Sequence, residues 1–388
     1  MHSVVILIIA SFLGCNADNT KRVVQGNHDF TTKTYEELVK ISGNNNIVVS
    51  GLSAEIILSL LANGAGGETH KQLLNGLSLP NNIRDVNKAF HEITSDLNID
   101  IPDLKLLSAN KIYQSQSYPI VQEFKDIARS TYSADVENLE LNDPEKAANT
   151  INGWVEQKTN NKIKNLIDPK IFEDRDVALV LVNALYYTGK WAFPFEKHNT
   201  ADRLFYSSST ESKKIPTMST KIFAKYAYNP NVRAKYLQLR FNPGDVIMTI
   251  VLPDEINGLA AAEQNLKEYL APQQMEVASV NVTLPIFKIE TEIDFIPILK
   301  KFGITRIFEN DADLSHMAKG PIKVSSVLQK ACIKLNENGV EAAAATAVIP
   351  VGYSAEFLKA TQTFNADHPF LFYISHNGLL LFMGRYVQ

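Results

Sequence analysis

Apolar residues recur at the spacing of a helix face along much of the first half of the chain. The pattern predicts helices at residues 35–41, 53–62, 85–97, 121–131 and 144–164. Ser50 and Ser53 are candidate N-caps of the second helix. The glycine-rich residues 64–69 would end that helix and start a further one through Gln72 and Leu73.

The second half of the chain is richer in alternating or continuous apolar runs. These predict strands at residues 177–187, 246–252, 280–290, 322–335 and 370–374. This order of elements, with helices first and mostly strands afterwards, is typical of an α+β fold rather than of a βαβ repeat. The 388 residues contain no linker-like stretch and no internal repeat, so we expect one large domain.

Charge and motif spacing exclude several function classes. The formal net charge of -4 with mixed signs argues against a nucleic-acid partner. The eight histidines show no metal-ligand spacing, and there is no phosphate-binding loop. Gly352-Tyr353-Ser354 begins like a nucleophile elbow, but Glu356 stands where the closing glycine belongs. We therefore predict no enzyme, no metal and no cofactor.

The first residues look like a targeting signal. Residues 4–13 are almost all apolar but too few to span a bilayer comfortably, and the small residues Gly14, Cys15 and Ala17 follow. We predict a signal peptide at residues 1–17, a mature domain at 18–388, secretion to the extracellular space and no membrane anchor. The region before the apolar run lacks Lys and Arg, which leaves open a buried N-terminal element or a bacterial lipobox at Cys15.

Cleavage after Ala17 would leave Cys332 as the single cysteine, so no intramolecular disulfide could form. Cys332 lies in an alternating strand pattern, which favours burial as a small hydrophobe over reactivity. Asn281-Val282-Thr283 is a glycosylation sequon. Asn281 is therefore the candidate glycosylation site, provided that the chain is secreted and the site is exposed.

Residues 337–354, ENGVEAAAATAVIPVGYS, do not suit one fixed conformation. Four alanines favour helix, the following residues 346–349 favour strand, and Pro350 and Gly352 interrupt both. Taken alone, the segment is either an Ala-rich connector or a loop that can enter a sheet without steric objection.

Several separated stretches together resemble the serpin superfamily. They are 46–50 (NIVVS), 64–69 (GAGGET), 151–156 (INGWVE) with Thr159 and 162–163, 183–191 (NALYYTGKW) with Phe193 and Phe195, 284–290 (LPIFKIE), Phe308 with 312–315 (ADLS), and 364–372 (FNADHPFLF). The last is close to the family's C-terminal signature. The resemblance implies a serpin fold, with about eight or nine helices around three β-sheets and an exposed reactive-centre loop near the C-terminus.

In serpins this loop is bait for a protease. After the acyl-enzyme forms, the cleaved loop inserts as a new central strand and carries the protease away. Insertion of about 15 residues, with a strand rise of about 3.3 Å per residue, would move the attached protease roughly 50 Å. The resemblance implies a hinge of small or β-compatible residues that consists of Glu337, Gly339, Val340, Glu341, Ala342, Ala343, Ala344, Ala345 and Thr346.

The family's spacing from Glu337 puts the scissile bond at Tyr353-Ser354. A tyrosine there would fill the apolar specificity pocket of a chymotrypsin-like protease. Cleavage at Phe357-Leu358 or at Lys359-Ala360 stays open, and Lys359 would redirect the target toward trypsin-like enzymes.

The resemblance also implies a polar cluster that holds the central sheet closed. Its candidate members are Ser50, Ser53, Asn183 and Gln329, with Gln329 at a position where many members carry histidine. Other departures are Gly51 in place of proline, Val340 in place of Thr or Ser, and Pro350, which would remove a ladder bond if insertion reached it. Residues 85–97 carry no basic stripe, so we expect no heparin activation.

The leading hypothesis is a monomeric, secreted suicide inhibitor that forms a covalent complex with a chymotrypsin- or elastase-like serine protease. The alternatives are a non-inhibitory serpin acting as carrier, storage protein or chaperone, or an inhibitor of a trypsin-like protease through Lys359. Inhibition of cysteine proteases also stays open. A hydrolase lacks a catalytic constellation in this sequence.

Overall fold

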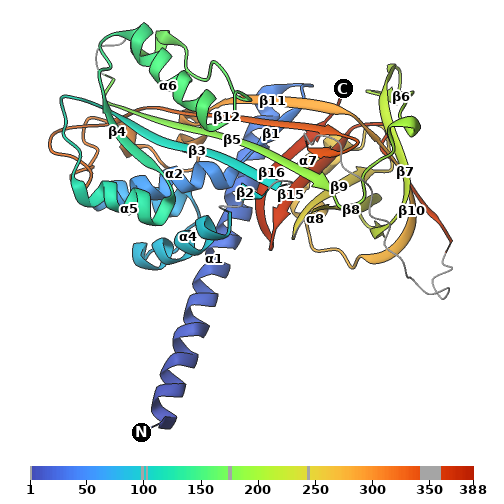
Figure 1. Cartoon of the computed structure of the whole chain (residues 1–388), viewed down its shortest axis with the longest axis horizontal. Coiled ribbons are helices and arrows are strands. Elements are labelled where there is room, and N and C mark those ends of the chain that lie inside the picture. The colour runs from blue at the N-terminus through green and yellow to red at the C-terminus, as the bar shows by residue number, and fades with distance from the viewer. Residues whose placement is uncertain (1, 98–99, 102–103, 174–176, 243–244, 341–359) are drawn as a thin grey trace.

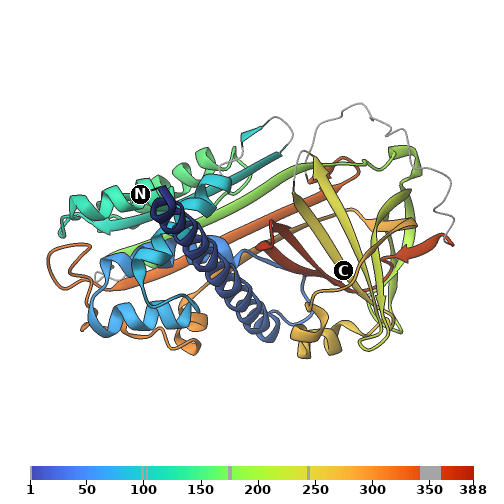
Figure 2. The same ribbon diagram turned by 90° about the horizontal axis from the view of Figure 1, so that it is seen from below.

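The computed structural model describes residues 2–97, 100–101, 104–173, 177–242, 245–340 and 360–388 (Figure 1). Helices α2, α4, α5 and α6 gather at one end of the molecule, and β6, β7, β8 and β10 lie at the other (Figures 1 and 2). The helices of the described residues are α1 His2–Ser42, α2 Gly51–Gly64, α3 Gly67–Gly76, α4 Ile83–Leu97, α5 Gln122–Tyr132, α6 Pro144–Lys158, α7 Leu259–Gln264, α8 Leu266–Tyr269 and α9 Ile296–Lys301.

Hydrogen bonds link the strands of the described residues into one sixteen-stranded network. The strands are β1 Ile47–Val49, β2 Asp100–Ile101, β3 Leu104–Ser115, β4 Asp135–Leu139, β5 Leu179–Trp191, β6 Ala201–Tyr206, β7 Ser212–Asn229, β8 Ala234–Asn242, β9 Val246–Pro253, β10 Glu276–Pro285, β11 Phe287–Asp294, β12 Val324–Asn336, β13 Gly339–Val340, β14 Gln362–Asn365, β15 Phe370–His376 and β16 Leu379–Tyr386.

The network divides into three sheets joined at their edges. The central sheet has the order β4-β3-β5-β12-β11, with β13 inserted between β5 and β12 at one end. A second sheet runs β1-β16-β15-β9-β8, and a third runs β6-β7-β10-β14. The end of β5 pairs with β8, and β7 pairs with β8, so the three sheets share one continuous set of ladders.

Strand β5 is buried along almost its whole length, because both faces of the central sheet are covered. Helix α6 and the segment that follows it pack on one face, and α2 packs on the other (Figure 1). Two buried clusters result, one on the α6 side and a larger one that extends through α2 into the second sheet. Coverage of both faces explains why residues 179–187 of β5 are apolar at every position except Asn183 rather than alternating.

Two of the short motifs seen in the sequence pack directly against each other. The Gly66 amide donates to the Asp313 carbonyl oxygen at 3.0 Å, and the Asp313 amide donates to Thr69 Oγ1 at 3.0 Å. A β-carbon on Gly66 would stand 2.3 Å from Asp313 Oδ2. Gly66 is the N-cap residue of α3, and its lack of a side chain lets the backbone approach a distant aspartate closely.

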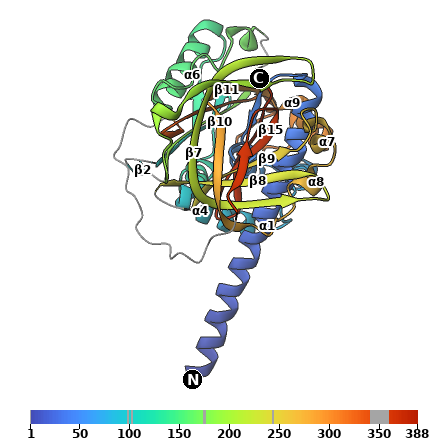
Figure 3. The same cartoon turned by 90° about the vertical axis from the view of Figure 1, so that its right-hand side faces the viewer.

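Helix α1 begins at His2, and its N-terminal part projects away from the body (Figures 1 and 3). The residues predicted to form a signal peptide lie in this projecting part, and their removal stays a prediction. Among the helices of the described residues, none combines the length and the apolar character needed to cross a membrane.

Three local expectations were wrong. The helix expected to reach residue 164 ends at Lys158, where Asn160 and Asn161 have left-handed φ angles of 50° and 59°. The strand expected at 280–290 is two strands, since β10 ends at Pro285 and β11 begins at Phe287 and pairs with β12 instead. Strands β3 and β4 also lie between helices, so the helices-first order was too simple.

Candidate functional site

The proposed hinge begins as a short strand that is already part of the central sheet. After β12, Glu337 and Asn338 form a turn, and β13 runs back between β12 and β5. Val340 pairs with Gly189 of β5 and is fully buried. β5 and β12 pair directly with each other from Leu179 and Val324 as far as Tyr186 and Cys332. The first two residues of the segment therefore lie immediately beyond the seam between these two strands.

The rest of the proposed hinge and the proposed scissile bonds lie outside the described residues. These positions are Glu341, Ala342, Ala343, Ala344, Ala345, Thr346, Tyr353, Ser354, Phe357 and Lys359.

Gly339 allows β13 to approach β5 this closely. Its φ is 132°, a value that side chains of L residues rarely permit. A β-carbon there would stand 2.1 Å from the Gly189 carbonyl oxygen and 2.8 Å from the Lys190 Cα. Only glycine meets both the conformational and the spatial requirement at this position.

The turn before β13 is held by groups from β5 and the segment after it. Thr200 Oγ1 donates to Glu337 Oε1 at 2.8 Å, and the Phe195 amide donates to the Glu337 carbonyl oxygen at 2.8 Å. The Trp191 amide donates to the Asn338 carbonyl oxygen at 2.9 Å. The turn is thus fixed at three points.

Trp191 also covers the end of the sheet with its side chain. The indole Nε1 donates to the Asn336 carbonyl oxygen at 3.1 Å. The ring stacks on Phe241 with a centroid separation of 4.4 Å and an interplanar angle of 15°. Both rings are buried, so the upper end of the seam is closed by apolar packing as well as by backbone bonds.

A row of polar side chains crosses the middle of the central sheet. Asn110 of β3, Asn183 of β5 and Gln329 of β12 are aligned by strand register. Each of the three is at least 95% buried, which is unusual for amides unless their polar atoms are bonded.

The N-terminus of α2 supplies the partners of this row. Gln329 Nε2 donates to Asn183 Oδ1 at 2.6 Å and to the Ser50 carbonyl oxygen at 2.9 Å, and its Oε1 accepts from the Ser50 amide at 3.1 Å. Asn183 Nδ2 donates to the Ser53 carbonyl oxygen at 2.9 Å. Ser50 Oγ caps α2 by accepting from the Ser53 amide. The structure therefore brings Ser50, Ser53, Asn183 and Gln329 together.

Asn110 is a further member of this row that the sequence pattern did not predict: its Oδ1 accepts from Asn183 Nδ2 at 2.5 Å and from Ser53 Oγ at 3.4 Å. The residue falls in a stretch of modest apolar content before Ile112, so no strand was expected there. One signal could have indicated it. Asn110 and the apolar Ile112 are two residues apart, so in a strand they lie on the same face, and that face would be buried.

The C-terminal signature anchors the part of the chain that begins at residue 360. Strand β14 pairs in parallel with β10, and Phe364 is fully buried. The His368 ring lies between Asp367 Oδ1 at 2.7 Å and the Pro253 carbonyl oxygen at 2.7 Å. This contact ties the chain just before β15 to the end of β9 in the second sheet, whereas β14 belongs to the third sheet, so the signature connects the two sheets.

Asn281 lies in β10 and is exposed. Its side chain is on the same side of the strand as Thr283, whose hydroxyl donates to Asn365 Oδ1. The sequon is therefore on an accessible sheet face rather than in a loop. Cys332 is buried, as expected, and burial raises the pKa of its thiol to about 11. Such a thiol is a poor nucleophile near neutral pH.

Comparison with known proteins agrees with this geometry. A family model described as Serpin (serine protease inhibitor) matches residues 25–388. Antichymotrypsin-2 of Bombyx mori is 34% identical over 364 residues, covering 92% of this chain and 96% of the relative. Antitrypsin of Bombyx mori is 33% identical over 368 residues, covering 94% and 93%. The crystal structure of Serpin48 from the insect Tenebrio molitor superimposes with a TM-score of 0.88 at 36% identity, covering 95% of this chain and 98% of that one.

Proposed function

The chain belongs to the serpin family, and on that premise we propose that it is a secreted suicide inhibitor of a chymotrypsin- or elastase-like serine protease. The protease would attack the Tyr353-Ser354 bond, and the cleaved loop would then enter the seam between β5 and β12. One observation carries this proposal: Gly339 and Val340 already lie between those two strands.

The position of Val340 supports insertion physically. A strand that continues beyond it would replace the parallel β5–β12 pairing with antiparallel ladders to both neighbours, which add hydrogen bonds. Val340 is buried in the larger cluster, on the α2 side of the sheet. Alternation then directs Ala342, Ala344 and Thr346 toward the same side. Small and β-branched residues are the ones that a finished core can accept there.

The proposal is tested by mixing the purified protein with chymotrypsin and running denaturing gels. We expect a complex that survives SDS, with release of a C-terminal peptide that begins at Ser354. Tyr353→Arg should transfer complex formation from chymotrypsin to trypsin, and Lys359→Ala should leave the reaction with chymotrypsin unchanged. Cleavage at Tyr353 with no complex would instead favour the non-inhibitory alternative.

Secretion belongs to the same proposal and has its own test. Expression in a secreting eukaryotic cell should release a mature chain that begins at Asp18, and N-terminal sequencing would detect it. The exposure of Asn281 supports glycosylation there. Removal of N-glycans should then increase gel mobility, and Thr283→Ala should abolish that shift because it destroys the sequon.

The surface of α4 supports the expectation that heparin does not activate the protein. The exposed side chains of this helix include Arg84, Lys88, His91, Glu92 and Asp96. The two carboxylates follow the basic groups along the helix, so α4 does not present basic charge along its whole exposed face to a polyanion. The rate of complex formation with chymotrypsin should therefore be the same with and without heparin.

A further inference from the structure

Helix α6 and residues 159–173 cover the seam between β5 and β12. The buried cluster beneath them contains Ile151 and Val155 of α6 and Ile163 of the following segment. It also contains Tyr113 of β3, Val182 of β5 and Cys332 of β12. Any strand that enters the seam must therefore pass beneath a packed layer, and that layer must loosen or lift during insertion.

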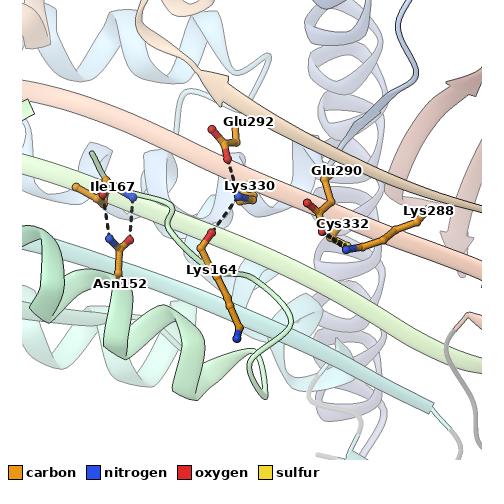
Figure 4. A network of polar contacts seen from close by, with 8 residues as sticks. All are labelled: Asn152, Lys164, Ile167, Lys288, Glu290, Glu292, Lys330 and Cys332. Atoms are coloured by element: carbon orange, nitrogen blue, oxygen red, sulfur yellow. Dashed lines mark hydrogen bonds and ion pairs between the residues drawn. The ribbon is translucent and has the colours of Figure 1, made fainter. Parts of the chain in front are cut away.

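On the β12 side, this covering layer is fastened by Lys330 (Figure 4). The Lys330 ammonium donates to the Lys164 carbonyl oxygen at 2.9 Å and pairs with Glu292 at 2.5 Å. The layer itself is tied together by Asn152, which donates to the Ile167 carbonyl oxygen at 2.9 Å and accepts from the Ile167 amide at 2.8 Å. Helix α6 and the segment after it thus form one unit that spans the seam.

On the β3 side, the corresponding contact centres on Lys111. Its ammonium lies 4.9 Å from the Tyr113 ring centroid and 4.8 Å from the Trp154 ring centroid. It also pairs with Glu137 Oε2 of β4 at 2.6 Å. The Lys111 side chain is only 8% exposed. The Tyr113 and Trp154 rings are themselves in edge contact, with an interplanar angle of 88°.

This arrangement joins α6 to the sheet through a cation. Trp154 is the contributor from α6, whereas Lys111 and Tyr113 belong to β3 and Glu137 to β4. A cation held against two aromatic faces and withdrawn from water is attracted far more strongly than one at the surface. Lifting α6 would separate the Trp154 ring from the Lys111 ammonium and expose that ammonium to water. The contact therefore opposes the lifting of α6 that strand insertion requires.

We infer that Lys111 is a positioning residue that fastens α6 over the β5–β12 seam and sets the rate at which a strand can enter. The inference rests on the proposed function, because it assigns Lys111 to the insertion step. It makes Lys111 and Lys330 the two anchors of one covering layer, on opposite sides of the seam. Release of the Lys111 anchor should accelerate insertion.

The test uses the purified full-length chain and a synthetic peptide with the sequence of residues 340–353. Uptake of the peptide is followed by native gel electrophoresis and by the gain in resistance to heat. Lys111→Met keeps the length of the side chain but removes its charge. We expect peptide uptake about tenfold faster than in the unmodified protein, a change within the range of one desolvated cation–π contact. Hydrogen exchange of the α6 amides should accelerate with it.

Two further variants and a control make the test specific. Lys111→Arg retains a cation that can lie against both rings and pair with Glu137, so its uptake rate should stay close to that of the unmodified protein. Trp154→Leu removes the ring on α6 and should accelerate uptake as Lys111→Met does. Lys158→Met makes the same chemical change at an exposed position of the same helix and should change neither readout.

The outcomes separate this inference from the proposed function. Unchanged α6 exchange in Lys111→Met would overturn it, as would faster exchange with unchanged peptide uptake. If no variant takes up the peptide, insertion itself fails and the role of Lys111 fails with it. If Lys111→Met accelerates uptake but the unmodified protein never traps chymotrypsin, the fastening role holds and inhibition of that protease does not.

Discussion

The carbonyl oxygen of Gly189 stands 2.1 Å from the point where any residue other than glycine at position 339 would place its β-carbon. This one contact decides whether the hinge can lie within the sheet. It links the backbone of β5, near the end of that strand, to the first residue of β13, so the position of the hinge within the sheet depends on glycine at position 339.

Gly339→Ala should expel β13 from the sheet. The loss should include the burial of Val340, worth about 2 kcal/mol for a valine side chain. We expect the free energy of unfolding in urea to fall by at least that amount. Gly303→Ala is the matched control, because Gly303 has a φ of 81° with nothing within 4 Å. It should show only the cost of the backbone conformation, about 1 kcal/mol. Equal losses in the two variants would contradict the role of the Gly189 contact.

Gln329→Ala should destabilise the centre of the sheet. It would leave Asn183 Oδ1 and the Ser50 amide without their Gln329 partner in a buried site, and the Ser50 carbonyl oxygen would keep its longer bond from the Ala54 amide, at 3.4 Å. The expected loss in free energy of unfolding is about 2 to 4 kcal/mol. Gln157→Ala, at an exposed position of α6, should change it by less than about 0.5 kcal/mol. The double variant Gln329→Ala/Asn110→Ala tests whether the polar row acts as a connected network. If its loss of stability equals the sum of the two single losses, the row does not act as one network.

Glu55 should make the stability depend on pH. This fully buried carboxyl of α2 has Asn27 Nδ2 as its partner at 2.8 Å, and its Oε1 has none among the described residues. Burial, followed by the charge of Asp29, raises the pKa of Glu55 well above its usual value, against the Asn27 bond that lowers it. The folded state therefore keeps a proton that the unfolded state has released, and stability falls as pH rises from the unfolded pKa toward the folded one.

The measurement is urea unfolding at several pH values from 5 to 8, for the unmodified protein and for Glu55→Gln. The variant should lose less stability as pH rises, by up to about 1.4 kcal/mol for each pH unit within the window. Glu37→Gln is the control: the bonds from Lys301 and Lys40 lower the Glu37 pKa, so this carboxyl is ionised in both the folded and the unfolded state across this range, and the variant's profile should run parallel to that of the unmodified protein. Parallel profiles for Glu55→Gln and the unmodified protein would show that Glu55 does not carry the dependence.

Gly153→Ala should stabilise α6. Gly153 is an exposed interior residue of the helix, and a β-carbon there would have nothing within 4 Å. The gain should be about 0.5 to 1 kcal/mol in thermal or urea unfolding. Gly51→Ala is the contrasting variant in α2, because its β-carbon would stand 2.0 Å from Thr31 Oγ1. It should destabilise the protein, because the added β-carbon would collide with Thr31.

Much of the fold followed from local patterns. Helices α2, α4 and α5 and strands β9, β12 and β15 lie within a few residues of where apolar spacing placed them, because each buries one continuous face. The burial of Cys332 followed from the same alternation. Strand β3 was missed because Lys111, Asn110 and Gln114 are polar yet buried. The spacing of apolar residues cannot show that other segments supply bonding partners for buried polar side chains.

The sequence by itself determined that this chain is a serpin, that Gly339 is a point of backbone freedom and that Ser50, Ser53, Asn183 and Gln329 are candidate partners. Only the tertiary structure decided that Val340 is already inside the sheet, that Asn110 completes the polar row and that Lys111 reaches Trp154. The physical reason is distance along the chain. Spacing reports which face of a segment is buried, whereas a contact between β3 and α6 or between β5 and β13 exists only after separate segments have packed.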